Sequence, residues 1–433
     1  MKSLDLWQLN EYTDMKPGLE RIRAFLSELG GPQKSFKAVH VAGTNGKGST
    51  AMMVSKILEA AGYKTGLYVS PHLVRMTERV RVNSKEISAR RLEMLGRRYF
   101  KMAEGHKLTF FEFITALAYI YFSEEKIDIA VLETGLGGRF DATNVIDKPL
   151  VSVITDIALD HTAVLGKTIA AIAKEKAGII KQGAPVVSGA SNPAASSVIR
   201  AAARSRGCAV AEYGRDFGYK HLRTDWKRSK QFIEFKGRGK KIELVLPLLG
   251  EYQPKNCSLA AACAQTLNRE GFSMPDKAIV NGVKRAVWPG RFDVRRVRLS
   301  GKAKTVILDG AHNPQAMDSF VRSFKESIWS KRSFDVIFGM LKDKDYSAAA
   351  KAVSKIGGNI IAVAVSSKRA LEPGKLLKAL SARRTKGAIT SARSLKEALG
   401  RTVSDTVVIT GSLYLVGEAL KYLDKNNFIK RTD

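Results

Sequence analysis

A run of glycines around one lysine carries the strongest chemical signal in the sequence. Residues 42–50 read Ala-Gly-Thr-Asn-Gly-Lys-Gly-Ser-Thr. Glycines let the backbone turn its N–H groups inward, a helix N-terminus favours anions, and Lys47 adds a positive charge, as in a phosphate cradle. The spacing departs from the strict P-loop, because Gly-x-x-Gly-Lys replaces Gly-x-x-x-x-Gly-Lys. The motif predicts nucleotide binding, and a plain strand-to-helix turn is the alternative.

Three further polar residues are candidate ligands for a metal ion. Gly48 stands where a metal-binding hydroxyl normally follows the lysine, so magnesium would take its ligands elsewhere. Mg²⁺ prefers a few hard oxygens together with water and substrate phosphates. Ser70, Glu133 and His161 each stand at or shortly after the end of a predicted strand. Taken singly, Ser70 could be a turn residue and His161 a helix cap. Glu133 could form an ion pair with Arg139. Their shared position at strand ends nevertheless favours a metal site.

Alternating strand and helix patterns position these residues. The phosphate-loop motif lies between a predicted strand at 37–42 and a predicted helix at 49–61. Further strands are predicted at 64–69, 127–133 and 150–156, and polar residues follow each of them. This alternation favours a mainly parallel sheet, whose ligands bind beyond the carboxyl ends of the strands.

A second alternation follows a break at the Trp-Pro-Gly-Arg sequence that begins at residue 288. Its predicted strands are 304–309, 334–338, 359–365 and 406–410. Residues 200–246 instead resemble β hairpins or an irregular insertion. We expect an α/β protein with a mainly parallel-sheet P-loop ATPase domain at 1–289, which carries this small β-rich insertion. A smaller, Rossmann-like α/β domain follows at 290–433.

The composition limits the possible classes of protein. The 433 residues are 45% hydrophobic and 26% charged, which excludes wholesale disorder. The longest strongly apolar run, Phe113 to Phe122, is about half the ~20 residues that a membrane span needs. Three cysteines form no CxxC pair and no even-numbered framework. These features predict a soluble, reduced, cytoplasmic protein.

The charge is strongly positive, with 72 Lys and Arg against 41 Asp and Glu, or +31. Such a charge suits a nucleic-acid binder, and it also suits an enzyme with polyanionic ligands. Between Arg200 and Lys241, 13 basic residues stand against four acidic ones. Aromatic residues lie among them and could stack bases. Alternating strands of a half-buried sheet give the same pattern, and we favour that interpretation. The aromatic residues among the basic ones are Tyr213, Phe217, Tyr219, Trp226, Phe232 and Phe235.

Taken together, the motifs resemble those of folylpolyglutamate synthase, also called dihydrofolate synthase, in the Mur ligase superfamily. They run in family order from about residue 40 to residue 415. They are Gly43-Thr-Asn-Gly-Lys-Gly-Ser49, Ser70-Pro-His72, Phe111-Glu-Phe113, Glu133-Thr-Gly-Leu-Gly-Gly-Arg-Phe-Asp-Ala-Thr-Asn144, Asp160-His-Thr162, Glu175-Lys-Ala-Gly178, Trp288-Pro-Gly-Arg291 and Asp309-Gly-Ala-His-Asn-Pro314.

The resemblance implies an ATP-dependent amide ligase with ATP and Mg²⁺ as cofactors. Members of the family convert a pterin-linked carboxylate to an acyl phosphate. The amino group of L-glutamate then attacks it, and ADP and phosphate are released. The expected partners are therefore a reduced folate or dihydropteroate and L-glutamate, with the glutamate on the domain at 290–433. We expect a monomer without a membrane or nucleic-acid partner.

The resemblance also implies roles for individual residues. Catalytic roles fall to Lys47, Lys176 and His312, and the family carbamylates the lysine at the position of Lys176. Without the resemblance, Lys176 would be an ordinary lysine on a solvated helix face. The implied ATP contacts are Asn45, Gly46, Lys47, Gly48, Ser49, Thr50, Asn256, Arg291 and Asp309. The implied metal ligands are Ser70, Glu133 and His161. The implied substrate contacts are Thr109, Phe110, Phe111, Phe140, Asp141 and Ala142 for the pterin, and Ser412, with His312, for the incoming glutamate.

Three alternatives remain, of which a non-catalytic relative is disfavoured by the intact Lys47, Glu133, His161 and Arg291. Another Mur-type ligase would join amino acids to a peptidoglycan precursor or cyanophycin. The Phe111 and Ser70 motifs count against it, as does the first strand near residue 37, which leaves no N-terminal domain for a UDP substrate. A nucleic-acid-binding ATPase is supported by charge alone and predicts a steep salt dependence of binding. The sequence leaves open whether dihydropteroate, tetrahydrofolate or both are acceptors.

Overall fold

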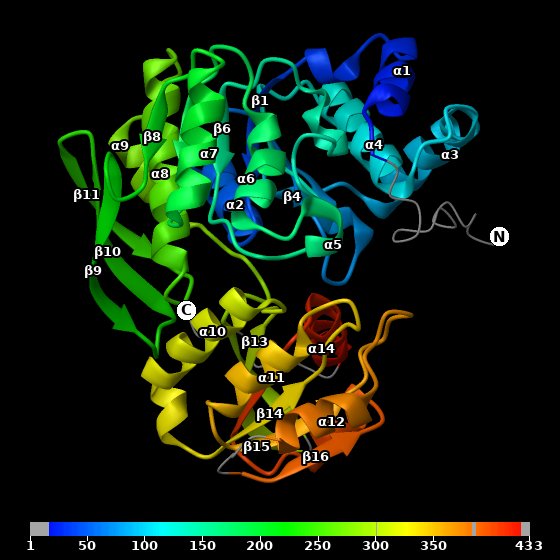
Figure 1. Cartoon of the computed structure of the whole chain (residues 1–433), viewed down its shortest axis with the longest axis vertical. Helices are drawn as coiled ribbons and strands as arrows, with labels where there is room; N and C mark the ends of the chain where they lie inside the picture. Colours follow the sequence, from blue (N-terminus) through cyan, green and yellow to red (C-terminus); the bar gives the residue numbers. More distant parts are fainter. Residues whose placement is uncertain (1–16, 300, 383–386, 426–433) are drawn as a thin grey trace. The chain divides into compact units, whose positions relative to one another are not determined.

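The computed structural model describes residues 17–299, 301–382 and 387–425. The chain forms two units (Figure 1). Of the described residues, the first unit contains those up to 220 together with 233–244 and 255–286, and the second contains 221–232, 245–254 and those from 287 onward. The predicted domain boundary at 289/290 stays a prediction, since the second unit also includes two earlier segments.

An eight-stranded sheet forms the centre of the first unit, in the order β4-β3-β2-β5-β1-β6-β7-β8. Neighbouring strands from β2 to β8 are parallel, while β3 and β4 are antiparallel additions at one edge. All four strands predicted here are present, so the mainly parallel sheet is confirmed. The bounds are β1 Lys37–Ala42, β2 Thr65–Tyr68, β3 Val80–Val82, β4 Lys85–Glu86, β5 Ile129–Glu133, β6 Val151–Ile154, β7 Val186–Ser188 and β8 Val210–Glu212.

Helices bury the apolar side chains of this sheet. Phe113 and Leu117 of α4 share one core with Ala38 and Leu132 from the strands. A second core joins α6 and α7 to the β6 side of the sheet. Helix α2 packs closely on α9, where a Cβ at Gly282 would lie 2.5 Å from the backbone of α2. The bounds are α1 Glu20–Glu28, α2 Lys47–Ala60, α3 Ala89–Gly105, α4 Phe110–Glu124, α5 Thr162–Leu165, α6 Ile169–Lys176, α7 Pro193–Arg204, α8 Gln253–Arg269 and α9 Asp276–Lys284.

From residue 217 the basic region forms a three-stranded sheet in the order β11-β10-β9, which confirms hairpins in this part, whereas its first part contains the end of α7 and strand β8. Its strands are β9 Phe217–Asp225, β10 Lys230–Gly237 and β11 Lys240–Leu246. Ile233 and Phe235 of β10 are fully buried and alternate with more exposed residues. The guanidinium of Arg223 lies 3.5 Å from the ring centroid of Phe232, and the indole of Trp226 packs 5.9 Å from the ring of Phe292. These aromatic side chains are used in packing, which favours the sheet interpretation over base stacking.

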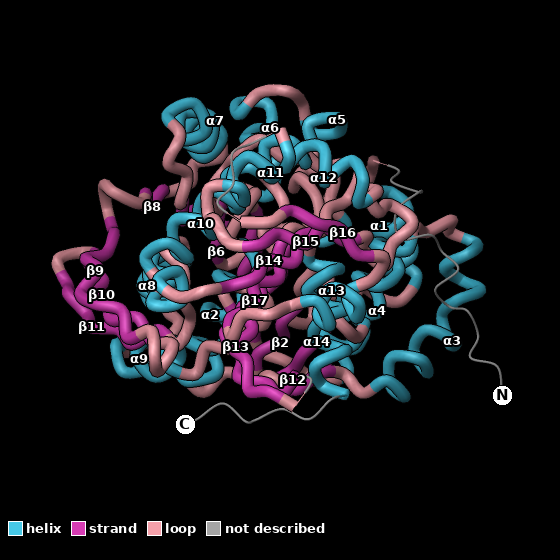
Figure 2. Tube along the Cα trace, turned by 90° about the horizontal axis from the view of Figure 1, so that it is seen from below, coloured by secondary structure: helices cyan, strands magenta, loops and turns pink. Residues whose placement is uncertain are grey.

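The second unit is built on a six-stranded sheet in the order β12-β13-β17-β14-β15-β16. Within the described strands of this sheet, β12 alone is antiparallel to its neighbour. Figure 2 shows α10, α11 and α12 on one side of this sheet and α13 and α14 on the other, so the predicted second α/β domain is confirmed. The bounds are β12 Asp293–Leu299, β13 Lys302–Asp309, α10 Pro314–Glu326, β14 Phe334–Phe338, α11 Tyr346–Ser354, β15 Asn359–Val363, α12 Pro373–Ser381, β16 Ile389–Ala392, α13 Leu395–Arg401, β17 Thr406–Thr410 and α14 Leu413–Lys425.

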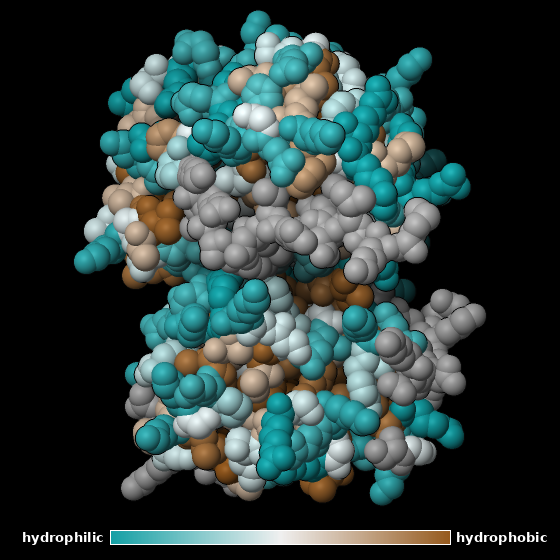
Figure 3. Space-filling model, turned by 90° about the vertical axis from the view of Figure 1, so that its right-hand side faces the viewer, coloured by the Kyte–Doolittle hydropathy of each residue, from teal (hydrophilic) through white to brown (hydrophobic). Residues whose placement is uncertain are grey.

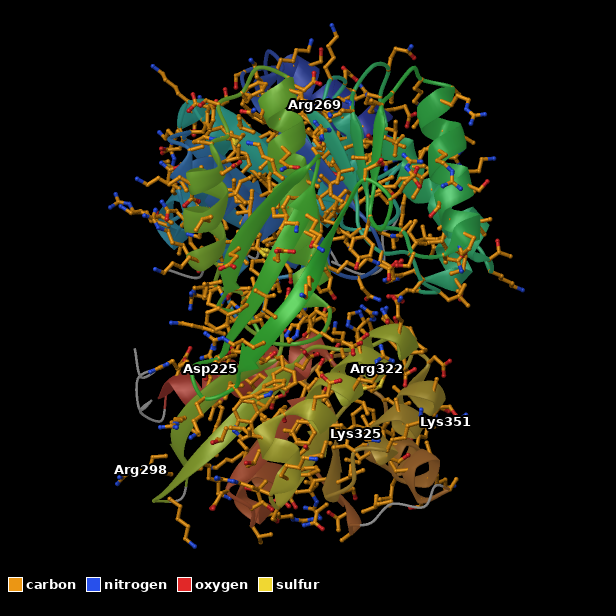
Figure 4. The ribbon with its side chains drawn as sticks, turned by 90° about the vertical axis from the view of Figure 1, so that its left-hand side faces the viewer. Asp225, Arg269, Arg298, Arg322, Lys325 and Lys351 are labelled. Atoms are coloured by element: carbon orange, nitrogen blue, oxygen red, sulfur yellow. The ribbon has the colours of Figure 1, made fainter. Side chains whose placement is uncertain are left out.

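The surface is largely hydrophilic on the face that Figure 3 shows. Among the helices in the described residues, none combines the length and the apolar character that a membrane crossing requires. Basic side chains occur on both units; Figure 4 labels Arg269 of α8 in the first unit, and Arg322, Lys325 and Lys351 of α10 and α11 in the second. Arg322 forms an ion pair with Glu251.

Candidate functional site

The predicted phosphate loop lies between β1 and α2, as the motif requires. Gly43 has a φ of +150°, and a Cβ there would lie 1.8 Å from Thr155 Oγ1. Gly46 has a φ of +86°, and a Cβ there would lie 2.3 Å from Asn256 Oδ1. Both positions therefore require glycine, for backbone conformation and for space. The second contact also brings Asn256 of α8, a predicted ATP contact, against the loop.

The segment after β6 holds the phosphate loop in shape. The Thr44 amide donates to the Asp156 carbonyl at 2.8 Å, and Thr155 Oγ1 donates to the Asn45 carbonyl at 2.7 Å. Lys47 Nζ donates to the Thr44 carbonyl at 3.2 Å. Gly46 precedes α2, and no side chain in the described residues caps this helix, whose N-terminus attracts an anion. The loop is therefore shaped to receive phosphate oxygens.

The remaining motif residues form the first turn of α2. Ser49 and Thr50 are buried there, next to Gly48. The hydroxyl of Thr50 has no hydrogen-bond partner among the described residues. A buried hydroxyl without a partner is costly, so it is a candidate to contact bound nucleotide.

Lys176 is buried beside the same loop. Its side chain is 4% exposed, and its Nζ donates to the Gly43 carbonyl at 2.6 Å. Burial, and next the positive charge of Lys47, lower the pKa of Lys176 from 10.5 to about 7. A substantial share of this amine is therefore neutral at pH 7. The alternative of a solvated surface lysine is wrong. Lys176 is the last residue of α6, and its side chain contacts the loop after β1.

Two of the three predicted metal ligands are joined by a hydrogen bond. The Ser70 amide, after β2, donates to Glu133 Oε2 at 3.1 Å, and Glu133 is 4% exposed at the end of β5. His161 lies in the segment after β6, has a φ of +50° and a side chain that is 40% exposed. Within the part of the chain that the structure covers, no three His, Cys, Asp or Glu side chains are grouped to hold a metal ion. The three-residue ligand set stays a prediction.

The ion pair between Glu133 and Arg139, which was the alternative to a metal-binding role of Glu133, is absent among the described residues. Arg139 instead pairs with Glu175 at 2.8 Å, and its guanidinium lies 4.5 Å from the ring centroid of Phe140. The Arg139 amide also donates to the Glu175 carbonyl at 2.8 Å. Arg139 thus fixes the loop after β5 to α6, next to Lys176.

The predicted pterin residues divide into exposed and buried ones. Thr109 caps α4, since its hydroxyl accepts from the Glu112 amide at 3.3 Å. Phe110 is 3% exposed and belongs to the core. Phe111 is half-buried, and its ring lies on Gly135, where a Cβ would be 2.5 Å from Phe111 Cζ. Phe111 is therefore the aromatic ring of this pair that a ligand can reach.

The loop after β5 carries the other three pterin candidates. Phe140 is 47% exposed, whereas Asp141 and Ala142 are 5% and 4% exposed. Asp141 Oδ2 accepts from the Leu136 amide at 2.8 Å, and Oδ1 accepts from the Thr143 hydroxyl and amide at 2.5 and 3.0 Å. Burial raises the pKa of Asp141, against the effect of these donors. This carboxylate is bound chiefly within its own loop.

Four predicted residues lie in the second unit: Arg291 before β12, Asp309 at the end of β13, His312 after β13 and Ser412 after β17. Asp309 is buried and accepts from the Tyr252 hydroxyl, the Phe292 amide and the Ala311 amide at 2.7, 2.8 and 2.8 Å. Burial raises the pKa of this carboxyl group. His312 Nδ1 lies 2.7 Å from the Gly310 carbonyl, so Nδ1 carries the proton. The other two are Arg291, whose Nη1 donates to the Gly290 carbonyl at 3.1 Å, and Ser412, which is buried and whose hydroxyl accepts from the Tyr414 amide at 3.2 Å.

Sequence reasoning missed several residues that shape the site. Thr155 and Asp156 were identified only as the end of a strand, although the parallel topology places that end beside the phosphate loop. Gly135 was identified only within a motif, and its contact with Phe111 depends on packing. The sequence around Tyr252 did not indicate a role at the site, because its contact with Asp309 joins residues 57 positions apart.

Comparison with known proteins agrees with this geometry. Family models of the Mur ligase middle domain and of the Mur ligase glutamate ligase domain match residues 41–264 and 290–413. Folylpolyglutamate synthase of Lacticaseibacillus casei is 36% identical over 408 residues, which cover 91% of this chain and 92% of that protein.

Solved structures are similar over nearly the whole chain. Mycobacterium tuberculosis folylpolyglutamate synthase with ADP has a TM-score of 0.85 and 30% identity, covering 97% of this chain and 98% of that one. Escherichia coli FolC with DHPP and ADP has a TM-score of 0.84 and 31% identity, covering 97% and 96%.

The fold and the phosphate site therefore define an enzyme of the Mur ligase class, which uses ATP to join an acid to an amino acid. Within that class, the chain belongs to the folylpolyglutamate synthase and dihydrofolate synthase family.

Proposed function

We propose that this chain adds L-glutamate to the carboxylate of a reduced folate or of dihydropteroate, using ATP and forming an acyl phosphate. The observation that carries the proposal is the edge of the first sheet where β1, β5 and β6 end. There the glycine-shaped loop, the buried Lys176 amine and the Glu133 carboxylate lie on adjacent parallel strands or touch the loop directly. The E. coli relative holds DHPP and ADP, which supports both ligand classes.

The reaction makes and breaks two bonds. A carboxylate oxygen of the acceptor attacks the γ-phosphorus of ATP, and the bond to the β-phosphate oxygen breaks, so that ADP leaves. The glutamate nitrogen then attacks the acyl carbon, inorganic phosphate leaves, and the nitrogen loses its extra protons to solvent. Phosphoryl transfer depends mainly on positioning and charge neutralisation. Lys47 and the N–H groups of α2 supply both for the transferred phosphoryl group.

Glu133, Ser70 and His161 would hold magnesium. The site fits a hard cation, because the Glu133 carboxylate is a buried oxygen donor that the Ser70 amide already orients. When bound, the ion neutralises charge on the phosphates. Removal of metal by a chelator should stop ADP release, and added Mg²⁺ should restore it.

Lys176 would act as a carbamate. An amine must be neutral to take up CO₂, and burial beside Lys47 favours the neutral form. Its hydrogen bond to the Gly43 carbonyl fixes the amine against the phosphate loop. The resulting carbamate would carry a negative charge beside Lys47 and the expected metal.

Acceptor and glutamate would bind through different units. Phe111, Phe140 and the Thr109 hydroxyl would contact the pterin. The domain from residue 290 would bind the incoming glutamate through His312 and Ser412. The match to a glutamate ligase domain at 290–413 supports this second assignment.

The decisive assay is ADP release by the full chain with dihydropteroate or tetrahydrofolate, with and without glutamate. We expect release that requires glutamate and at least one acceptor, together with a product one glutamyl residue heavier by mass spectrometry. ADP release that needs neither compound, or that RNA stimulates, would contradict the proposal.

A further inference from the structure

A buried chain of polar side chains links β1 to the loop after β5. His40 lies in the middle of β1 and is 0% exposed. Its Nε2 is 2.8 Å from Thr143 Oγ1, and that hydroxyl is 2.5 Å from Asp141 Oδ1. None of these contacts takes part in the phosphate chemistry described above.

The direction of each hydrogen bond follows from the number of protons available. An ionised carboxylate only accepts, so the single hydroxyl proton of Thr143 goes to Asp141. The hydroxyl oxygen must then accept from His40, which fixes the Nε2–H tautomer. Burial, and next the charge of Lys181, lower the pKa of His40 to about 3, so the ring stays neutral at physiological pH. His40 Nδ1 has no hydrogen-bond partner among the described residues, as expected for the nitrogen without a proton.

This series of hydrogen-bonded side chains ends at the loop whose surface would receive the acceptor. Asp141 accepts a hydrogen bond from the Leu136 amide, and the nearby Gly135 amide lowers the pKa of this carboxyl group. Gly135 lies directly under the Phe111 ring, with no room for one more carbon. A movement of this loop would therefore move the surface on which Phe111 rests.

A histidine is a costly residue at this place in the strand. Its neighbours Val39 and Val41 show that apolar side chains fill β1, and burying a polar ring without full hydrogen bonding is unfavourable. Among the described residues, the His40 side chain hydrogen-bonds to the Thr143 hydroxyl, a contact that leucine could not make. The contact is therefore the property that distinguishes histidine here.

We propose that His40 is a positioning residue for the acceptor: through Thr143 it holds Asp141 and thereby the Gly135–Leu136 segment beneath Phe111. The inference rests on the proposed function, because it assigns Phe111 to acceptor binding. Both His40 and Thr143 act through the loop and not by touching a substrate.

The test compares Thr143→Val with Thr143→Ser in the full chain. Valine keeps the shape of threonine but removes the hydroxyl, whereas serine keeps the hydroxyl. The kinetic constants KM for dihydropteroate, KM for tetrahydrofolate, KM for ATP and kcat are measured, with the melting temperature as a control. We expect Thr143→Val to raise the acceptor KM roughly tenfold, the effect of losing one buried hydrogen-bonding group. The ATP KM should change less than twofold, and Thr143→Ser should behave as wild type.

A second pair covers the case in which Thr143→Val does not fold. His40→Gln offers an amide donor near the position of Nε2, and His40→Leu offers none. We expect His40→Leu to weaken acceptor binding in calorimetry without nucleotide, and His40→Gln to restore most of it. Equal acceptor affinity in both members of either pair, or an equal rise in acceptor and ATP KM, would overturn the inference. A wild-type chain that ligates neither acceptor would instead refute the proposed function, so the two failures are distinguishable.

Discussion

Two loops at the same sheet edge of the first unit are built by different means. The phosphate loop after β1 takes its shape from glycines, and its carbonyl groups are held by Lys176 and Thr155. The loop after β5 takes its shape from the buried Asp141 carboxylate, which gathers backbone amides and one hydroxyl. The first presents its donors to a ligand, and the second uses most of its polar groups on itself. Changes in the phosphate loop should therefore affect the chemical step, and changes in the other loop should affect acceptor affinity.

The largest effect should come from Lys47→Ala. This change removes the charge aimed at the transferred phosphoryl group, and losses of this kind cost on the order of 10² to 10³ in rate. The melting temperature should stay near that of wild type, because the hydrogen bond of Lys47 Nζ to the Thr44 carbonyl lies within the loop itself. Ligation within tenfold of wild type would contradict the assignment of the phosphate loop.

Lys176→Arg should be nearly as damaging. A guanidinium keeps its charge and cannot take up CO₂, so no carbamate forms. Lys176→Ala should also be nearly inactive, and small carboxylates such as formate or acetate are expected to restore part of its activity by filling the vacated anion position. Full activity of Lys176→Arg would exclude the carbamate but leave the ligase assignment in place.

Glu133→Gln should raise the magnesium concentration needed for half-maximal activity by roughly tenfold, since a charged oxygen ligand becomes neutral. Activity is measured across a magnesium titration with ATP held constant. The maximal rate at saturating metal should recover substantially. An unchanged titration curve with a lower melting temperature would show that Glu133 has a structural role only.

Gly135→Ala tests the second loop. The new methyl group would lie 2.5 Å from Phe111 Cζ, so the ring must move. We expect the acceptor KM to rise by about tenfold, comparable to other overpacking penalties of ~1–3 kcal/mol, while the ATP KM stays constant. Gly105→Ala is the matched control, because nothing lies within 4 Å of a Cβ there. An acceptor KM that stays at the wild-type value would separate Phe111 from the acceptor site.

The smallest effect is a pH dependence of stability. The folded-state pKa of Lys176, about 7, lies below the ordinary value of 10.5, so the unfolded chain binds more protons between these two values. The contribution of Lys176 to the free energy of unfolding therefore rises with pH in this window, by about 1.4 kcal/mol per pH unit. In Lys176→Met this slope should disappear. Urea unfolding in CO₂-free buffer at pH 7.5 and 9.5 gives the free energy of unfolding of the wild type and of Lys176→Met. An equal change between the two pH values in both proteins would mean that the amine stays charged.

The same contrast explains how much could be predicted from the sequence. Every strand predicted from 37–42 to 406–410 is present, because short apolar runs between polar ends specify buried parallel strands. The phosphate loop was predictable since glycine and lysine have few other reasons to occur in that pattern. Asp141 and Phe110 look like ligand contacts in a motif, yet one is bound within its loop and the other is in the core. Side-chain direction within a loop depends on tertiary contacts such as that of His40 with Thr143, which spacing does not encode.

The arrangement of the second unit along the chain has a consequence for its assembly. Its core includes Trp226, which packs on Phe292 and Trp329, and its buried Asp309 accepts the Tyr252 hydroxyl. Both partners are translated before residue 255, whereas residues 255–286 return to the first unit. A fragment starting at residue 290 would expose aromatic rings and leave a buried carboxylate without its phenol donor. The two units are therefore interleaved in the order of synthesis, and neither can be completed on the ribosome before the other has begun.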